Sequence, residues 1–220
     1  MTKFELNFND ETIKQTYERL GFTKGWRFMT CPKERLYDAE FGIIGLQPGG
    51  NTHDRINDNW SQELGNAYEV EVWEGRIAGN SPLQLQVKRL CSLLGTSPAQ
   101  IFSAQFVPFR SPSWAEMQNK GAAIDFANSI WSETLSKAAN LRTIFCIGLD
   151  EPTSSIARIV NAQQIASSPT GWGDIMYKLF QTNDGRNVVG LPHLSRFRLF
   201  GKLERDILFK NTMQKLGIDL

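Results

Sequence analysis

The chain has few of the residues that build disulfide frameworks and metal centres. Its 220 residues include three cysteines and two histidines. Cys31, Cys91 and Cys146 each stand alone, no Cys-x-x-Cys pair occurs, and His53 and His193 are far apart in the sequence. An odd number of isolated cysteines argues against a disulfide framework. The missing ligand spacing argues against zinc or an iron–sulfur cluster. We therefore expect no metal and no cofactor.

Long apolar runs are also missing. The opening residues, MTKFELNFNDETIK, lack the apolar core of a signal peptide, and no apolar run approaches the length that spans a bilayer. These absences predict a cytoplasmic protein without a membrane partner. The chain also lacks the lysine and Ser/Thr of a P-loop and the glycine spacing of a dinucleotide-binding loop. We therefore expect no nucleotide cofactor.

Charge of one sign does not dominate, because the net charge is +1. That value neither demands nor excludes a nucleic-acid partner, since the local field decides. Basic residues do gather in the sequence around position 193, and on charge alone a solvated basic face would explain them. They are Arg186, Arg196, Arg198, Lys202 and Arg205.

What the chain does have is an alternation of apolar, strand-like segments with helical ones. The strands are expected at residues 41–46, 101–107, 143–149 and 186–191. The helices are expected at residues 10–20, 82–94, within 115–140, around 154–165 and at 202–216. Near-continuous apolar strands between helices predict an α/β fold with a parallel sheet covered on both faces. With no repeat or linker in view, residues 1–220 are expected to form one domain.

Three shorter segments complete the prediction. Residues 68–73 alternate valine with glutamate, which suits a short exposed strand or a helix edge. Residues 167–171 (SSPTG) are expected to be a loop. Residues 174–180 and 186–191 flank an Asp-Gly pair, which favours a hairpin.

The ends of the predicted strands carry the candidate functional residues. Right-handed crossovers bring the carboxyl ends of parallel strands to one edge of a sheet, where open α/β folds bind ligands. Gln47 follows the first strand, and its amide can position a water but cannot act as a strong base. His193 follows the last strand and can donate a hydrogen bond to a carbonyl oxygen that gains negative charge.

The second strand ends in Gln105 and Phe109, which could read the polar edge of a planar ring and stack on its face. Each candidate also has a structural interpretation, and both interpretations stay open at this point. A turn without chemistry, a structural histidine and a core aromatic beside a turn would explain the same residues.

Three segments, within residues 41 to 200, resemble motifs of the uracil-DNA glycosylase superfamily in the family's order. The first family motif is a strand followed by Gly-(Gln/Ile/Met)-(Asp/Asn)-Pro, to which residues 45–49 (GLQPG) are similar. The last is a strand followed by His-Pro-Ser-Pro or a relative, to which residues 193–196 (HLSR) are similar. Between them, several branches carry Asn-x-Val-Pro-Phe-Arg-Pro-Pro, which residues 105–112 (QFVPFRSP) resemble.

The resemblance implies a three-layer α/β/α sandwich around a four-stranded parallel sheet, and hydrolysis of the N-glycosidic bond between a base and its deoxyribose. The partner would be duplex DNA with the target base flipped out. By this resemblance Gln47 would position the attacking water, His193 would stabilise the oxygen of the departing base, and Gln105 would read the base edge. Further substrate contacts would come from Pro48, Gly49, His53 and Phe109. The loop facing DNA would contain Ser195, Arg196, Phe197 and Arg198.

The chain departs from the family pattern at three positions. Gln47 and Gln105 stand where the family has Asp or Asn, and Leu194 stands where it has proline. Because glutamine is one methylene longer, a pocket for plain uracil would not obviously accept both. The family includes bacterial antiviral glycosylases that remove bulky modified cytosines from phage DNA, and the departures favour such a substrate.

The matched motifs contain no lysine that could form a Schiff base, so we expect base release without strand cleavage. Two alternatives remain. One is an ordinary uracil or mismatch repair glycosylase. The other is a non-catalytic member that binds DNA or a protein.

Overall fold

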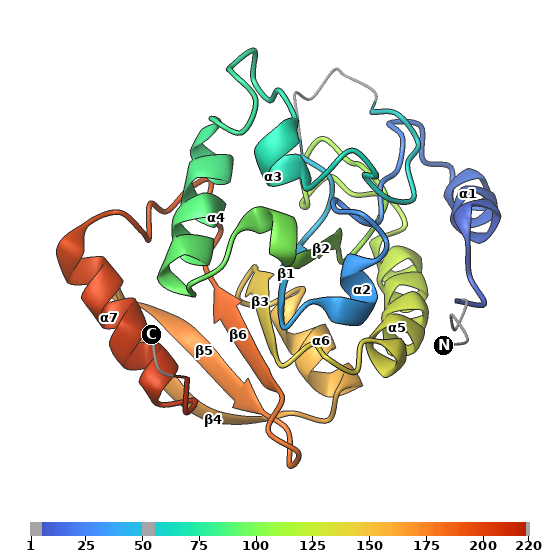
Figure 1. Ribbon diagram of the computed structural model, residues 1–220. Helices are drawn as coiled ribbons and strands as arrows, with labels where there is room; N and C mark the ends of the chain where they lie inside the picture. The colour runs from blue at the N-terminus through green and yellow to red at the C-terminus, as the bar shows by residue number, and fades with distance from the viewer. Residues whose placement is uncertain (1–5, 50–55, 219–220) are drawn as a thin grey trace.

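The computed structural model describes residues 6–49 and 56–218, and its centre is a sheet of six strands in the order β2-β1-β3-β6-β5-β4 (Figure 1). The first four strands in that order run parallel to one another. Strand β5 is antiparallel to β6, and β4 is antiparallel to β5. The strands are β1 (Phe41–Gly45), β2 (Phe102–Gln105), β3 (Thr143–Ile147), β4 (Gln163–Trp172), β5 (Ile175–Gln181) and β6 (Asn187–Leu191). The expected parallel sheet and the hairpin of β5 and β6 are confirmed.

The expectation of a four-stranded sheet was incomplete, and residues 167–171 are strand rather than loop. They belong to β4, where buried Ser168 and Thr170 alternate with exposed Ser167 and Pro169. The Ser168 hydroxyl accepts a hydrogen bond of 2.9 Å from Thr212, so this polar strand packs through hydroxyl groups that a hydrophobicity pattern overlooks. Proline is tolerated there because β4 is an edge strand.

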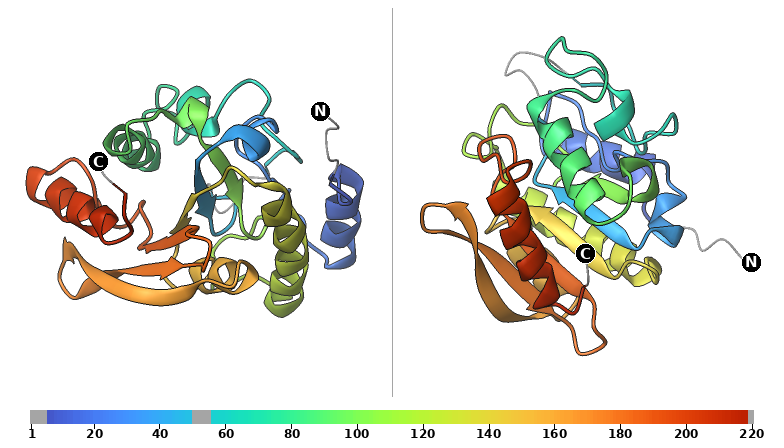
Figure 2. Two further views of the ribbon diagram at one scale, coloured as in Figure 1. Left: turned by 60° about the horizontal axis from the view of Figure 1, so that its bottom comes forward. Right: turned by 60° about the vertical axis from the view of Figure 1, so that its left-hand side comes forward.

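Helices cover both faces of the sheet, as the sequence predicted (Figure 2). Ile44 and Ile144 pack in one apolar cluster with α5 and α6, whereas Ile43 and Phe145 pack in a second cluster with α4 and α7. Neighbouring strand residues point to opposite faces, so these clusters form separate layers. The helices are α1 (Asp10–Arg19), α2 (Arg35–Asp38), α3 (Ala67–Val70), α4 (Pro82–Leu93), α5 (Lys120–Lys137), α6 (Thr153–Ile159) and α7 (Leu203–Gln214), with a 3-10 turn at Pro98–Gln100.

Residues 68–73 begin in α3, which agrees with a helix edge, one of the two alternatives expected for them. The Asn66 side chain caps the Tyr68 amide at 3.1 Å. Helix α6 ends at Ile159, earlier than expected, because Asn161 adopts a left-handed φ of 57° and turns the chain into β4. Within residues 6–49 and 56–218, no helix is both long and apolar enough to cross a membrane.

Candidate functional site at the carboxyl edge of the sheet

The carboxyl ends of β2, β1, β3 and β6 lie side by side, so the three matched motifs meet at one edge. Gly45 pairs with Gln105 across β1 and β2, and pairing continues past the strands through the Phe106 amide on the Gly45 carbonyl at 2.7 Å. On the other side, the Gly148 amide donates to the Leu191 carbonyl at 2.8 Å, which joins the ends of β3 and β6. Gln47, Gln105 and His193 therefore follow strands of the same parallel set.

Gln47 is oriented by the loop that follows β2. Its amide nitrogen donates to the Ser111 carbonyl at 3.2 Å. Because a carbonyl can only accept, this contact assigns the nitrogen and leaves the Gln47 Oε1 as the free end of the amide. That oxygen is buried and has no hydrogen-bond partner in the described structure. It is a buried acceptor that the described residues leave unsatisfied.

Gln105 lies flat across Gly45. A Cβ added at Gly45 would sit 2.6 Å from the Gln105 Oε1 and 3.3 Å from its Nε2. Only glycine at position 45 lets the amide take this place. The Gln105 Oε1, like that of Gln47, is buried without a partner within the described residues. Buried acceptors normally find a donor, so two unpaired amide oxygens on neighbouring strands indicate a site that receives a ligand or water.

We expect a methyl group at Gly45 to move Gln105 without unfolding the protein. In Gly45→Ala the clash falls on the end of a flexible side chain, so the free energy of unfolding should fall by only about 1 kcal/mol or less. Base release, the activity proposed below, should fall at least about tenfold, since misplacement of a positioning group is costly. Urea unfolding and a base-release assay measure both effects. Gly121→Ala in α5, where the added methyl meets nothing, is the control that should keep wild-type activity.

His193 follows β6 and is partly buried. Burial lowers its pKa below the ordinary value, and the positive charge of Arg196 lowers it further, so the ring is neutral at pH 7. The Ser195 hydroxyl lies 2.8 Å from Nδ1. When that hydroxyl donates to Nδ1, the ring proton sits on Nε2, which is then a hydrogen-bond donor. Ser195, predicted to contact DNA, is thus placed to orient His193.

The loop after His193 is held by contacts with the apolar core and with Trp172. Leu194, at the position where the motif that it resembles has proline, is buried in the apolar cluster that includes residues of α4 and α7. Phe197 is half-buried edge-on against Trp172, with ring centroids 5.9 Å apart. The indole nitrogen of Trp172 donates to the Arg198 carbonyl at 3.0 Å. The tip of the hairpin formed by β4 and β5 therefore supports the loop after His193.

The basic cluster expected around His193 is smaller than predicted. Arg186 lies at the opposite end of β6, where its guanidinium donates to the carbonyls of Leu135 and Ala138 at the end of α5, at 3.3 and 3.2 Å. It was misplaced because a five-residue strand separates it from the loop. Arg205 is half-buried over the Trp172 ring at 4.4 Å. Arg196, Arg198 and Lys202 are exposed.

We expect this division to show in DNA binding. Arg196→Gln and Arg198→Gln should each weaken binding to duplex of any sequence and lower the slope of log K against log salt by about 1. Arg186→Gln, the matched control with the same charge change, should leave the slope unchanged and instead lower the free energy of unfolding by about 1 kcal/mol. Fluorescence anisotropy at several salt concentrations separates the two groups. Equal slopes for all three variants would contradict the assignment.

Phe109 does not lie where a stacking residue must. It is fully buried, and its ring stacks with Phe22 at 4.8 Å and with Phe126 at 5.6 Å. The prediction that it stacks on a base is wrong for this structure, because the chain after β2 turns inward and bridges to Trp26. Phe109 is a core aromatic beside a turn.

The remaining predicted contacts come from the loop after β1. Pro48 is buried and Gly49 is exposed. The Gly49 carbonyl accepts a 3.1 Å hydrogen bond from Arg110, a residue that is only 2% exposed. His53 lies outside the described residues.

Two residues at this edge were missed by sequence reasoning. Arg110, in the loop after β2, donates a hydrogen bond to the loop of Gln47. In the sequence it is one residue of the segment 105–112, and nothing there distinguishes it from its neighbours. Glu151 follows β3, and its Oε2 is buried without a hydrogen-bond partner in the part of the chain described. The signal for Glu151 was its position two residues after the predicted strand 143–149, and it lies four residues beyond Ile147, where β3 ends.

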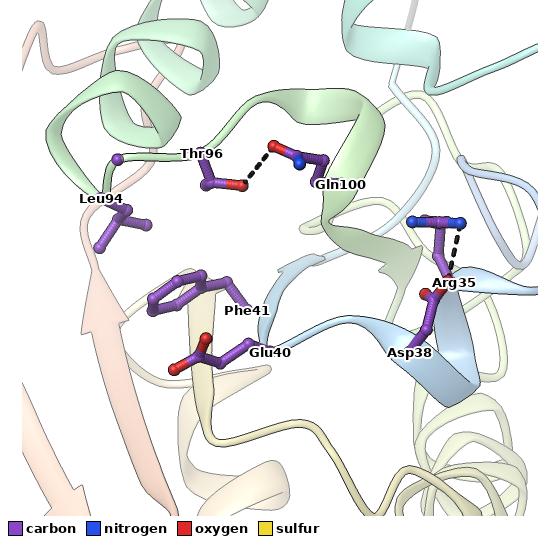
Figure 3. A pocket seen from close by; sticks show the side chains of 8 residues that line it. Arg35, Asp38, Glu40, Phe41, Leu94, Thr96 and Gln100 are labelled. Atoms are coloured by element: carbon purple, nitrogen blue, oxygen red, sulfur yellow. Dashed lines mark hydrogen bonds and ion pairs between the residues drawn. The ribbon is translucent and has the colours of Figure 1, made fainter.

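Two hollows open on the surface of the described residues. One, of about 410 Å³, borders the carboxyl edge through Arg110 and Ser111. The other, of about 380 Å³, lies at the amino end of β1 (Figure 3). In it Arg35 pairs with Asp38 at 2.7 Å and Thr96 bonds Gln100 at 3.2 Å, so these polar groups satisfy one another. The second hollow has no link to the residues at the carboxyl edge.

Comparison with known proteins adds no assignment. No family model matches the chain, and no curated protein matches it. The function must therefore be argued from the residues of the site.

Proposed function

We propose that this protein is a DNA glycosylase that hydrolyses the N-glycosidic bond of a non-standard pyrimidine and leaves an abasic site. The observation that carries the proposal is the meeting of Gln105, Gln47 and His193 on a parallel set of strands in the order β2-β1-β3-β6. Both glutamines offer unpaired acceptors, and the histidine offers a donor at Nε2 when the Ser195 hydroxyl donates to Nδ1. The resemblance of the three motifs and the four parallel strands support the same assignment.

In the proposed reaction, Gln47 acts on the sugar, and His193 and Gln105 act on the base. As the bond breaks, the sugar becomes oxocarbenium-like and the departing base becomes anionic. The Gln47 Oε1 accepts a hydrogen bond from water and aims it at the sugar. The neutral His193 ring donates from Nε2 to the base oxygen on which negative charge develops, as an oxyanion donor does. Gln105 hydrogen-bonds the edge of the base.

DNA binding is required to extrude the base from the duplex, which costs a few kcal/mol. Arg196, Arg198 and Lys202 are exposed on and beside the loop that carries His193, so phosphate contacts made there would also bring His193 to the DNA. Support of this loop by Leu194 and Trp172 limits the ordering that binding would cost.

The substrate we favour is a bulky modified cytosine of phage DNA, removed as antiviral defence. Gln47 and Gln105 are both longer than the family's Asp or Asn, which changes where water and base must sit. The base-stacking contact expected from Phe109 is absent because that ring is inside the core. Both features favour a pocket different from one shaped for plain uracil.

The test is a screen for alkali-labile abasic sites. Purified protein is incubated with duplexes containing uracil and with phage genomic DNAs that carry different cytosine modifications. We expect cleavable sites in modified-cytosine DNA. Sites in the uracil duplex alone would instead establish a repair glycosylase. DNA binding without base release on every substrate would reject catalysis and favour a non-catalytic binding protein.

A further inference from the structure

We propose that Glu151 is the proton acceptor of the reaction, the role that the amide of Gln47 cannot fill. The inference rests on the proposed glycosylase function and adds a catalytic residue to it. It starts from the one carboxylate oxygen at the carboxyl edge that is buried and has no hydrogen-bond partner among residues 6–49 and 56–218.

Glu151 lies in the loop between the loops that carry Gln47 and His193. Strand β3 lies between β1 and β6, so the loop after β3 is flanked by the loop of Gln47 on one side and the loop of His193 on the other. The charge of Glu151 is close enough to the Cys146 thiol to help raise its pKa, after the larger effect of burial. Cys146 is opposite Ile44 on β1 and Gly190 on β6. The carboxylate is therefore near Cys146, close to the carboxyl end of β3.

The Glu151 Oε2 belongs to a pattern of buried acceptors. The buried side-chain oxygens without a partner among the described residues are those of Gln47, Gln105, Glu151 and Tyr177. Of these, Gln105 is the last residue of β2, and Gln47 and Glu151 lie two and four residues beyond the ends of β1 and β3. Three neighbouring strands thus each have, at or just past the carboxyl end, an acceptor that the described residues do not satisfy, and a water or substrate with donors would satisfy it.

The loop that carries Glu151 is firmly held. Lys178 from β5 donates to the Leu149 carbonyl at 2.8 Å, and the Thr153 hydroxyl donates to the Gly148 carbonyl. Gly148 has a φ of 140°, and a Cβ there would lie 2.2 Å from the Glu151 carbonyl oxygen, so the close turn requires glycine. Such support is what a positioned catalytic group needs.

Glu151 differs from the neighbouring Asp150 in the exposure and pairing of its carboxylate. Asp150 is 98% exposed at its side chain and lies 3.3 Å from Lys178, as an ordinary surface ion pair. Glu151 is only partly exposed and has no such partner in the described structure. The two adjacent acids therefore differ in environment, and of the two only Glu151 has a buried oxygen without a hydrogen-bond partner among the described residues.

In the proposed step, the oxygen of the water held by Gln47 forms a bond to the sugar C1′, and the bond from C1′ to the base nitrogen breaks with its electron pair going to the base. The water proton passes to the Glu151 carboxylate, and the His193 Nε2–H hydrogen-bonds the negative oxygen of the base. Before proton transfer, the negative carboxylate also stabilises the positive charge on the sugar.

The experiment compares Glu151→Gln with Asp150→Asn in the full chain. Each change removes one negative charge from the same loop at nearly constant size. On the DNA that the wild type processes, the single-turnover rate at saturating protein should fall about 10²–10⁴-fold for Glu151→Gln, the range of general acid–base catalysis. Asp150→Asn should stay within about threefold of wild type, as expected for an exposed pair. Glu151→Asp, which keeps a carboxylate, should recover part of the rate.

Binding and folding are measured on the same samples. Glu151→Gln should bind abasic-site duplex with wild-type affinity and give a wild-type circular dichroism spectrum, since only the chemical step is affected. Wild-type activity in Glu151→Gln would overturn the role of Glu151 and leave the glycosylase function standing. An equal rate loss in Asp150→Asn, or no gain in Glu151→Asp over Glu151→Gln, would also overturn it. A wild-type protein that releases no base would overturn the function and this inference with it.

Discussion

Replacing His193 with alanine should lower the rate of base release by about 10²–10³-fold, the cost of removing one donor to a developing oxyanion. The reason is the position of the ring at the end of β6, with its Nδ1 2.8 Å from the Ser195 hydroxyl, which leaves Nε2 as the proposed donor to the base. DNA affinity should change little. The measurement is a single-turnover assay beside a binding titration.

Ser195→Ala serves as the companion variant. It removes only the hydroxyl that orients the ring, so it should lower the rate less than His193→Ala does. A His193→Ala protein that keeps wild-type activity would remove the histidine from the mechanism.

The same histidine should leave a mark on stability against pH. Burial, and then the charge of Arg196, lowers its pKa in the folded protein, whereas the unfolded chain has an ordinary value of about 6.5. Between these two values the unfolded state binds more protons, so stability rises with pH and is lost as pH falls. Urea unfolding from pH 7.5 to 5 should therefore show a steeper acid loss for the wild type than for His193→Ala.

Arg110→Ala should produce the largest loss of stability among the variants considered, about 2–4 kcal/mol. The side chain is 2% exposed, so its removal leaves both a cavity and an unpaired Gly49 carbonyl, which formerly accepted from its Nε at 3.1 Å. The loop of Gln47 loses its tie to the loop after β2, so activity should fall as well. Urea denaturation gives the free energy of unfolding.

Arg198→Ala is the matched control for this substitution. Its side chain is exposed, and surface substitutions of this kind usually stay within about 0.5 kcal/mol. If both arginine variants unfold at the same urea concentration, the buried tie between the two loops does not stabilise the protein.

The parallel core was predictable because its strands carry strong local signals. Segments such as Thr143–Ile147 are almost entirely apolar, as is typical of strands buried on both faces, and helices separate them along the chain. The Asp-Gly turn before β6 likewise announces a hairpin. Strand β4 escaped prediction because the side chains it buries include Ser168 and Thr170, whose hydroxyls pair with other polar groups.

The candidate site was predictable only as far as strand ends show it. Gln47, Gln105 and His193 follow apolar strands, and parallel strands end at one edge. What sequence spacing could not show is how the chain continues beyond an edge. Phe109 turns into the core, Arg186 lies at the other end of its strand, and Glu151 becomes notable only because its oxygen is buried without a partner.

The most direct test of the account is detection of the free base. Modified-cytosine phage DNA is incubated with the wild type, His193→Ala and Gln47→Ala, and the small molecules released are identified by mass spectrometry. The account predicts one modified pyrimidine base from the wild type, an intact DNA backbone, and strongly reduced release from both variants. Equal release from all three proteins, or no base released by the wild type from any substrate, would contradict it.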